Sequence, residues 1–284
     1  MIAITGANGQ LGQLVIHSLL AKTDAKNIVA LVRNLKTSQP LQQLGVEVRH
    51  ADYNQPETLK TALNGVDKLL FISGSDIGRR IQQHKAVIEA AKEANVSLLA
   101  YTSILKADTS PMTLAVEHKQ TEALIKESTL PATILRNGWY TENYTQNIQR
   151  VLTTGEVTGA VQAGKLYTAA RKDYAEAAAV VLTSKDHAGK VYELSGDTGF
   201  TLTEYAAEIS KQTSKNIPYQ NLSEEALAKQ LTQIGLPEGF ANILADSEVH
   251  AANGWLAEKS NTLSHLIGRA TTPLSKSITE ALNS

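Results

Sequence analysis

Short apolar runs alternate with stretches of helical periodicity through the first half of the chain. The run "NIVALV" at 27–32 is continuously apolar, as a strand covered on both faces should be. Amphipathic or capped patterns such as "PETLKTALNG" at 56–65, which starts with proline and ends with glycine, separate the runs. This alternation predicts an α/β fold, a Rossmann-like doubly wound parallel sheet with helices on both faces. Further strands are expected at 2–5, 46–53, 67–73, 97–103 and 132–137, and further helices at 11–19, 81–94 and about 115–127.

The rhythm loosens after about residue 140. "DYAEAAAVVLTS" at 173–184 predicts a helix, and "KVYELSG" at 190–196 predicts another strand. From residue 201 the pattern is mostly helical, with one short extended piece, "NIPYQNL". We therefore expect a Rossmann domain over 1–150 and a smaller, mostly helical substrate-side lobe over 151–284. The strand at about 190–195 is expected to return to the first domain.

Composition excludes several classes of protein. The 284 residues include no cysteine, so disulfides, thiolate metal sites and cysteine nucleophiles are excluded together. The seven histidines show no H-x-x-x-H spacing, and no metal site is predicted. A net charge of −1 gives no attraction to nucleic acid or to an anionic membrane. With no signal peptide and no apolar run of about 18 residues, a soluble cytoplasmic protein is expected.

The first predicted strand runs directly into three regularly spaced glycines. The sequence is Gly6-Ala-Asn-Gly9-Gln-Leu-Gly12, placed between an apolar strand and an amphipathic helix. A first glycine permits the tight turn, a second lets backbone approach a pyrophosphate, and a third lets helix pack on strand. The N–H groups at the start of the helix then face the anion. In this context the motif predicts a dinucleotide site rather than a plain turn.

The ends of the next strands indicate which nucleotide binds. Enzymes that use NAD place an acidic residue after the second strand to hold the ribose 2′-OH. Here that strand ends in Arg33, whose guanidinium suits a 2′-phosphate, so NADP(H) is predicted. Asp52, after the third strand, could accept from the adenine amine or cap the next turn. The small residues Ser73, Gly74 and Ser75 would let the cofactor lie across the end of the fourth strand.

The proton-donating pair of ordinary short-chain reductases is missing. Those enzymes carry Tyr-x-x-x-Lys on the helix that corresponds to "TLAVEHKQTEALI", where Leu114 and His118 stand at the two positions. Shifting the register to Lys119 would need tyrosine at Ala115, so no register restores the motif. Hydroxyls remain at 102–103, but a hydroxyl alone is a poor proton donor. No catalytic residue is therefore assigned.

This absence favours two kinds of function. A reductase without an internal acid suits a substrate that takes hydride and then picks up its proton from water. A quinone is such a substrate, because hydride addition gives a stabilised hydroquinone anion. Alternatively, nothing is reduced and the fold senses NADP as a regulatory protein with no turnover.

Several segments together resemble a known family. "MIAITGANGQLG", "IVALVRN", "EHKQTEALI" and "LRNGWYTENY" resemble the NmrA-like branch of the atypical short-chain dehydrogenase/reductases. Within that branch the likeness is closest to the bacterial type 2 NADPH:quinone oxidoreductases, and it continues to "LIGRATTPL" near the end of the chain. The resemblance implies flavin-independent reduction of quinones by NADPH, with the quinone in a cleft between the lobes. The alternative within the same branch is an NADP-sensing regulator.

The resemblance also implies which residues bind the cofactor. It assigns the glycine loop to the pyrophosphate, Arg33 to the 2′-phosphate and Ser73–Ser75 to the length of the cofactor. It assigns a segment after the sixth strand to the nicotinamide, and Arg171 to the same cleft. The expected cofactor-binding residues are Gly6, Ala7, Asn8, Gly9, Gln10, Leu11, Arg33, Ser73, Gly74, Ser75, Asn137, Gly138, Trp139, Tyr140, Thr141, Glu142 and Arg171.

Two aromatic residues in this segment are the expected substrate surface. Trp139 and Tyr140 follow a sheet strand in a chain with only 5% aromatic residues, and their faces could stack on a flat quinone. They could equally be core anchors of the second lobe. Asn8 stands where threonine is common in the branch, and both side chains are small and polar. The sequence does not indicate the oligomeric state.

Overall fold

The computed structural model describes all 284 residues, which form two compact units interleaved along the chain. Unit 1 consists of Met1–Ile104, Glu117–Asn137 and Arg171–Tyr192. Unit 2 consists of Leu105–Val116, Gly138–Ala170 and Glu193–Ser284. Whereas the sequence predicts one boundary at residue 150, the chain passes between the units at several points. Residue 150 itself lies inside a helix of unit 2.

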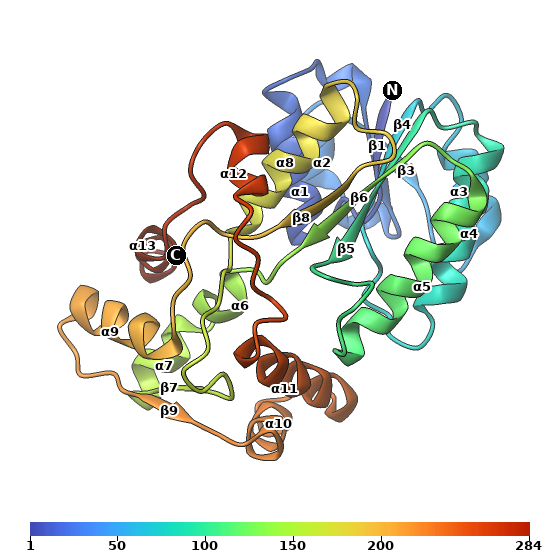
Figure 1. Ribbon diagram of the computed structural model, residues 1–284. Coiled ribbons are helices and arrows are strands. Elements are labelled where there is room, and N and C mark those ends of the chain that lie inside the picture. Colours follow the sequence, from blue (N-terminus) through green and yellow to red (C-terminus); the bar gives the residue numbers. More distant parts are fainter. The chain divides into compact units, whose positions relative to one another are not determined.

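The sheet of unit 1 follows the doubly wound order β3-β2-β1-β4-β5-β6, with β8 added beside β6 (Figure 1). The pairs from β3 to β6 are parallel. β2 is buried along its whole length, as its continuous apolar sequence predicts. The strand expected near 190–195 is β8, at the edge of this sheet. The strands are β1 (Ile2–Ile4), β2 (Ile28–Val32), β3 (Glu47–His50), β4 (Lys68–Phe71), β5 (Leu98–Ile104), β6 (Ala132–Asn137) and β8 (Val191–Leu194).

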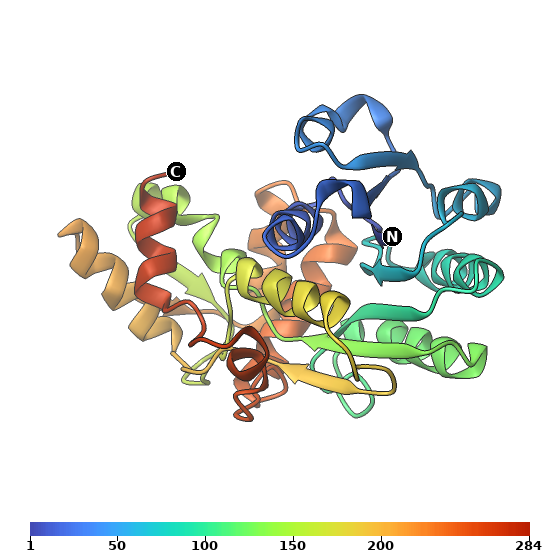
Figure 2. The same cartoon turned by 90° about the horizontal axis from the view of Figure 1, so that it is seen from above.

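Helices cover both faces of this sheet. Helices α1 and α8 lie side by side on one face, whereas α3, α4 and α5 cover the other (Figures 1 and 2). The alanine-rich sequence of α8 lets it approach α1 closely, because its buried face is formed mostly by small side chains. The helices are α1 (Gln10–Leu20), α2 (Gln39–Gln43), α3 (Pro56–Ala62), α4 (Arg80–Glu93), α5 (Thr113–Ser128) and α8 (Arg171–Thr183), with short 3₁₀ turns at Ala25–Asn27 and Leu35–Thr37.

The main core of unit 1 lies between the sheet and helices α3 and α4. Strand residues such as Leu69 and Phe71 pack there against Leu59 and Val87 from the helices. Each of these side chains is fully buried, and full burial of a side chain of this size contributes about 1.5–3 kcal/mol. The core therefore fixes the strands whose carboxyl ends form the predicted cofactor site.

Unit 2 is mostly helical, as the sequence predicts for the second half. Its two short strands, of three residues each, form a parallel pair. One of them lies within the extended piece predicted at "NIPYQNL", whereas the other is too short to give a sequence pattern. Helix α10 packs on α11, and α9 contacts both strands. The elements are β7 (Val157–Gly159), β9 (Tyr219–Asn221), α6 (Glu142–Thr145), α7 (Ile148–Thr154), α9 (Leu202–Thr213), α10 (Glu224–Gln233), α11 (Glu238–Ala252), α12 (Thr262–Ile267) and α13 (Leu274–Leu282).

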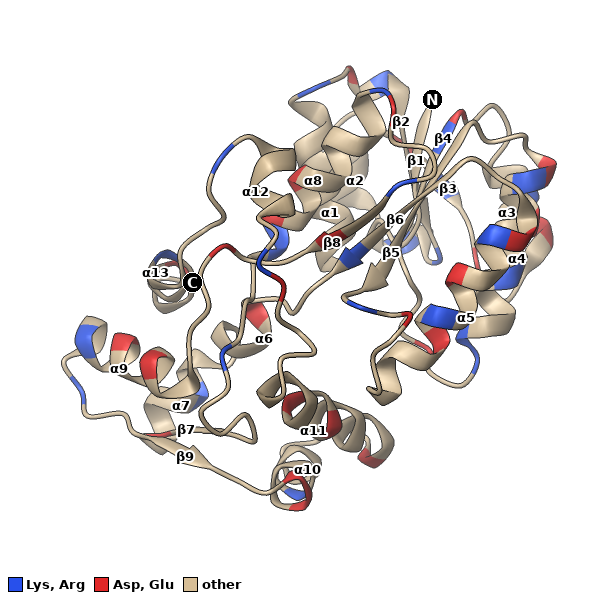
Figure 3. Cartoon of the chain, viewed as in Figure 1, with Lys and Arg blue, Asp and Glu red and all other residues tan.

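Charged residues of both signs are mixed on the outer helices of unit 1. Lysines and arginines alternate with acidic residues along α3, α4 and α5 (Figure 3). Such a surface has no stripe of positive charge of the kind that tracks a nucleic-acid backbone. None of the helices combines the length and apolar character that crossing a membrane requires.

Candidate cofactor and active site

The glycine loop joins β1 to α1 in a conformation that leaves the start of the helix open. Gly6 has a φ of +60°, which favours glycine, and its carbonyl accepts from the Gly9 N–H at 2.9 Å. Gly9 is the N-cap of α1, and no side chain caps the helix. The first turn of α1 also has no acidic residue. The free N–H groups and the positive end of the helix dipole therefore remain available to an anion.

The other two glycines of the motif have different tasks. A Cβ on Gly12 would lie 2.4 Å from the Gly6 carbonyl oxygen and 2.7 Å from the Ala7 Cα, so helix and loop could not pack as they do. A Cβ on Gly9 would meet only the Gly6 oxygen, at 3.1 Å, and would otherwise point into open space. Gly12 thus serves packing, whereas Gly9 keeps a space above the loop clear.

Arg33 follows β2 and is exposed, with no ion pair or hydrogen bond inside the protein. The loop that carries it is tied to the glycine loop by Asn8. The Asn8 side chain donates to the Thr37 Oγ1 at 3.0 Å and to the Asn34 carbonyl at 3.4 Å. The free guanidinium and the glycine loop therefore belong to one connected surface of unit 1.

Asp52, after β3, is expected from the sequence either to accept from the adenine amine or to cap the next turn, and its hydrogen bonds show that it caps the turn. The Asp52 carboxylate accepts from the Asn54 backbone N–H at 2.9 Å and from the Gln55 side chain at 3.2 Å. It therefore caps the turn before α3, as one of the two alternatives has it. Ser73, Gly74 and Ser75 follow β4, and Ser73 donates its N–H to the Thr102 Oγ1 at 2.9 Å.

His118 of helix α5, which stands at the lysine position of the missing Tyr-x-x-x-Lys motif, is buried and already paired. His118 is only 6% exposed, and its Nδ1 lies 2.8 Å from the hydroxyl of Tyr101, which is fully buried. Burial, followed by the positive charge of Arg80, lowers the pKa of His118 well below its usual value, so the ring is neutral. Burial likewise raises the pKa of Tyr101. Sequence reasoning did not foresee this buried Tyr101–His118 pair, since no spacing rule links a strand tyrosine to a helix histidine.

The carboxylate of Glu122, also on α5, is hydrogen-bonded through both of its oxygens. Glu122 accepts from the Ser103 Oγ at 2.6 Å, and forms an ion pair with Arg136 at 2.7 Å. Arg136 also donates from Nε to the other carboxylate oxygen at 3.0 Å, so the pair is bidentate and nearly buried. The Ser103 hydroxyl is therefore used to hold the sheet end together.

Asn137 ends β6 and starts the segment predicted for the nicotinamide. It is 5% exposed, and its Oδ1 has no hydrogen-bond partner within the protein. A buried amide oxygen without a partner is costly, and it marks a place where a donor from a ligand would fit. The residues that follow, 138–142, belong to unit 2, whereas Asn137 and the other predicted cofactor residues belong to unit 1.

The part of the predicted segment in unit 2 is held firmly. Thr141 donates its N–H to the Ala169 carbonyl at 3.0 Å, and its hydroxyl lies 2.7 Å from that of Thr168. Trp139 is 9% exposed, whereas Tyr140 is half-buried. Arg171, also predicted to bind the cofactor, is the first residue of α8 and half-buried.

Unit 2 also contains a carboxyl group with an altered pKa that the sequence does not reveal. The Glu248 Oε2 accepts from the Ala160 N–H at 2.6 Å. Burial raises the pKa of Glu248 to about 7, and the Ala160 N–H opposes this shift. The Tyr144 hydroxyl lies near this carboxyl and also opposes the shift, while burial raises the pKa of Tyr144 itself. A lone glutamate in a helix gives no signal of such surroundings.

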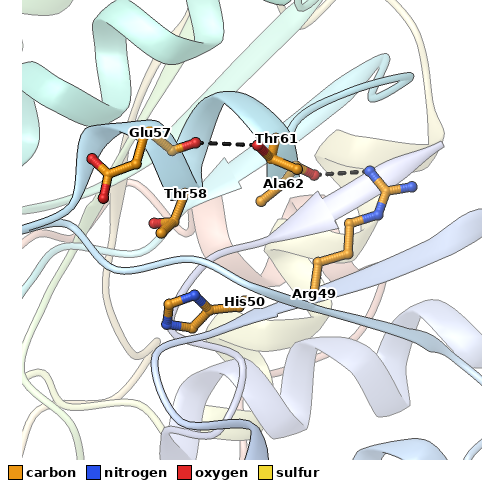
Figure 4. A pocket seen from close by; sticks show the side chains of 6 residues that line it. All are labelled: Arg49, His50, Glu57, Thr58, Thr61 and Ala62. Atoms are coloured by element: carbon orange, nitrogen blue, oxygen red, sulfur yellow. Dashed lines mark hydrogen bonds between the residues drawn. The ribbon is translucent and has the colours of Figure 1, made fainter.

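A surface pocket lies between β3 and α3, and none of the residues predicted to bind the cofactor lines it (Figure 4). Its arginine, Arg49, donates to the carbonyls of Ala62 and Asn64 at 2.8 and 2.7 Å and pairs with Glu47. The cation therefore caps the end of α3 and is not available to a ligand. No group of three or more histidine, aspartate or glutamate side chains could hold a metal ion.

Comparison with known proteins gives consistent matches over the whole chain. The model of the NmrA-like family matches residues 1–276. Quinone oxidoreductase 2 of Escherichia coli is 51% identical over 283 residues, covering 100% of this chain and 99% of that protein. The crystal structure of an E. coli NADPH-dependent quinone oxidoreductase with NADPH superposes with a TM-score of 0.96 and 51% identity, covering all of both chains. The NADP(H) complex of Citrobacter triphenylmethane reductase gives a TM-score of 0.94 and 39% identity, covering 99% of this chain and 100% of that one.

Proposed function

We propose, since the chain belongs to the NmrA-like family, that it is an NADPH:quinone oxidoreductase that works without flavin. The likeness to the E. coli enzyme covers the entire chain, so it includes both units and not the nucleotide-binding half alone. This observation carries the proposal, because an identity of 51% that persists through both units includes the segment after β6 that is proposed to contact the nicotinamide and the substrate.

The residues of unit 1 fit NADPH. The uncapped start of α1 and the space above Gly9 suit a pyrophosphate, and the unpaired guanidinium of Arg33 suits a 2′-phosphate. The orphaned Asn137 Oδ1 suits an amide donor such as the carboxamide of a nicotinamide. When bound, NADPH supplies the hydride for the reduction.

In the proposed site, each group has a physical task. Arg33 holds the 2′-phosphate and thereby selects NADPH over NADH. The backbone around Gly9 holds the pyrophosphate, and Ser73–Ser75 line the cofactor. Asn137 fixes the plane of the nicotinamide through its free oxygen. The other residues that we assign to cofactor binding are Gly6, Ala7, Asn8, Gln10, Leu11, Gly138, Trp139, Tyr140, Thr141, Glu142 and Arg171.

The substrate is proposed to use the aromatic residues of the segment after β6. Trp139 is mostly buried, so a flat quinone would contact its remaining exposed part and the ring of Tyr140. Trp139→Ala is expected to weaken quinone use more than NADPH binding. The location in the cytoplasm and the lack of a nucleic-acid partner stay predictions from the sequence.

The proton for the product comes from water in this proposal. His118 is buried, neutral and bonded to Tyr101, and the usual Tyr–Lys pair is absent. Hydride transfer to a quinone gives a stabilised hydroquinone anion, which can take its proton from water afterwards. Hydride transfer to an aldehyde would give a far more basic and less stable alkoxide, so that reaction needs a proton donor during the transfer. The chain should therefore reduce quinones well and carbonyl compounds poorly.

A steady-state assay with several acceptors tests the proposal. Purified protein, shown by its absorbance spectrum to be free of flavin, is given NADPH with simple quinones, aldehydes or ketones. We expect rapid oxidation of NADPH with quinones and little with the carbonyl compounds. Tight NADPH binding without turnover of any quinone would instead support the NADP-sensing regulator.

A further inference from the structure

The segment that follows β4, residues 72–74, is held by side chains from three different elements. The N–H of Ile72 donates to the Thr5 Oγ1, that of Ser73 to the Thr102 Oγ1, and that of Gly74 to the His84 Nε2, each at 2.9 Å. Thr5 follows β1, Thr102 lies in β5 and His84 lies in α4. Three consecutive backbone donors are thus paired with side chains, which define the path of this segment.

Both backbone polar groups of Gly74 are hydrogen-bonded to buried side chains. Its N–H donates to His84, and its carbonyl accepts from the Arg80 Nε at 2.8 Å. His84 is fully buried and Arg80 is 4% exposed. A buried guanidinium needs a counter-charge, which Glu117 of α5 supplies at 3.6 Å from Arg80 Nη1. Glu117 also accepts from the Gly78 N–H at 3.0 Å, so it fixes the far end of the same loop.

The hydrogen bonds around His84 define one protonation state. Because the Gly74 N–H can only donate, the His84 Nε2 must accept and the proton must lie on Nδ1. The Nδ1 then donates to the Thr121 Oγ1 at 2.8 Å, and Thr121 donates to the Glu117 carbonyl at 2.8 Å. Burial, with the charge of Arg80, lowers the pKa of His84 to about 3. The neutral ring is therefore kept under all ordinary conditions.

We infer that His84 and Arg80 are positioning residues that hold the Gly74 peptide ready for the cofactor. This inference rests on the proposed function, in which Ser73–Ser75 line NADPH. A segment already fixed in its bound shape loses no backbone freedom on binding, and ordering one residue costs about 1–2 kcal/mol, or roughly 5- to 30-fold in affinity. The inward face of α5, which carries the proton donor in ordinary short-chain reductases, supports this clamp through Glu117 and Thr121.

Two substitutions at His84 separate positioning from packing. In His84→Gln the amide oxygen reaches the place of Nε2 and can still accept from Gly74. In His84→Asn the shorter amide reaches only the place of Nδ1, so the bond to Thr121 can remain but Gly74 loses its acceptor. Both variants lose the ring and its edge-to-face arrangement with Phe71, whose ring centroid lies 4.7 Å from that of His84, so the two variants share the loss of the aromatic contact and differ by one methylene.

The measurements are NADPH affinity by calorimetry and hydrogen–deuterium exchange of the peptide that contains residues 72–78. We expect His84→Gln to bind NADPH within about threefold of the wild type, whereas His84→Asn binds roughly 10-fold more weakly and exchanges faster in this peptide. At saturating NADPH, kcat should be kept in both. Equal weakening in the two variants would overturn the inference.

A milder pair covers the case in which the His84 variants do not fold. Thr102→Val keeps the shape but removes the acceptor for the Ser73 N–H, whereas Thr102→Ser keeps that acceptor. Weaker NADPH binding in Thr102→Val alone supports a preformed segment, and equal affinities contradict it. If the wild type binds no NADPH, the proposed function fails and this inference fails with it. If the wild type binds NADPH and the matched pairs do not differ, only the inference fails.

Discussion

The sheet ends after β1 and β2 differ from those after β4 and β5 in how many polar groups already have partners. After β1 and β2, the first turn of α1 is uncapped and the Arg33 guanidinium forms no ion pair. After β4 and β5, the backbone donors of 72–74 and the hydroxyls of Thr102 and Ser103 are all hydrogen-bonded within unit 1. We call the first region, whose polar groups lack partners, open, and the second region, whose polar groups are already paired, closed.

This difference suggests that the open region binds the cofactor, whereas the closed region supports the site structurally. Exposed donors and a free cation can exchange water for an anionic ligand, so the open region suits the phosphates of a dinucleotide. In the closed region the backbone donors of residues 72–74 already have partners, and the two histidines are held neutral by burial. This division suits a protein that binds and orients a cofactor, and the buried, neutral histidines of the closed region are in line with the proposed quinone acceptor.

The largest expected effect is at the two glycines of the open region. Gly9→Val should abolish turnover and NADPH binding, because its side chain would fill the space above the loop while α1 still folds. Gly12→Ala should instead destabilise the fold, by about 1–3 kcal/mol, since its Cβ would clash with the Gly6 carbonyl. Circular-dichroism melting and NADPH titration of both variants check this. Retained NADPH binding in a folded Gly9→Val protein would show that the loop is not the phosphate site.

The next effect concerns the choice between cofactors. Arg33→Asp should weaken NADPH by about 1.5–3 kcal/mol, or roughly 10- to 100-fold, and NADH far less, because a charge-assisted contact with the 2′-phosphate is lost. KM values for both cofactors measure this. Lys22→Asp, an exposed change of the same charge just beyond the C-terminal end of α1, is the matched control. Equal losses of NADPH and NADH would mean that Arg33 does not bind the 2′-phosphate.

The closed region should lose stability in acid. His84 has a folded-state pKa of about 3, below its unfolded value, so its contribution is complete above about pH 6.5 and declines as the pH falls toward 3. At pH 5 this costs up to about 2 kcal/mol relative to pH 7. Urea unfolding at both pH values should show a smaller loss in His84→Gln than in the wild type. His17→Gln, on the exposed side of α1, controls for loss of a histidine, and an unchanged acid loss in His84→Gln would contradict the expectation.

The smallest effect is expected at His118. His118→Ala should lower stability but keep kcat for quinones within about 10-fold, because the ring is buried against Tyr101 and faces no substrate. Tyr101→Phe, which removes only the partner hydroxyl, should behave in the same way. A general acid would lose about 10²- to 10⁴-fold in rate, and its pH–rate profile would lose one limb. Such a loss in His118→Ala would show that His118, and with it the closed region, takes part in catalysis.

The fold could be predicted because its signals are local and repeated. Continuous apolar strands such as 28–32 and a glycine loop between strand and helix leave few alternatives to a doubly wound sheet. The helix predicted at 173–184 corresponds to α8, but its membership of unit 1 is not predicted, since small residues show only that another element packs closely. The short strand at 157–159 has too few residues to give a pattern.

The open region of the site could also be predicted, whereas the closed region could not. Motif spacing locates the uncapped start of α1 at Gly9 and the exposed Arg33 after β2, because both positions are fixed by the strands directly before them in the sequence. The polar residues Glu117 and Thr121 look like the solvent face of a helix, and only the path of the segment after β4 explains their burial. Interactions between residues far apart in sequence leave no local pattern to read.

A single-turnover experiment tests the central claim most directly. Flavin-free protein preloaded with NADPH is mixed with a simple quinone, and the nicotinamide absorbance is followed, with the Gly9→Val protein as the control. We expect one equivalent of NADPH to be oxidised per subunit as one equivalent of hydroquinone forms, and no such phase in the control. Stable NADPH absorbance in the wild type, despite tight binding, would contradict the assignment as a quinone reductase.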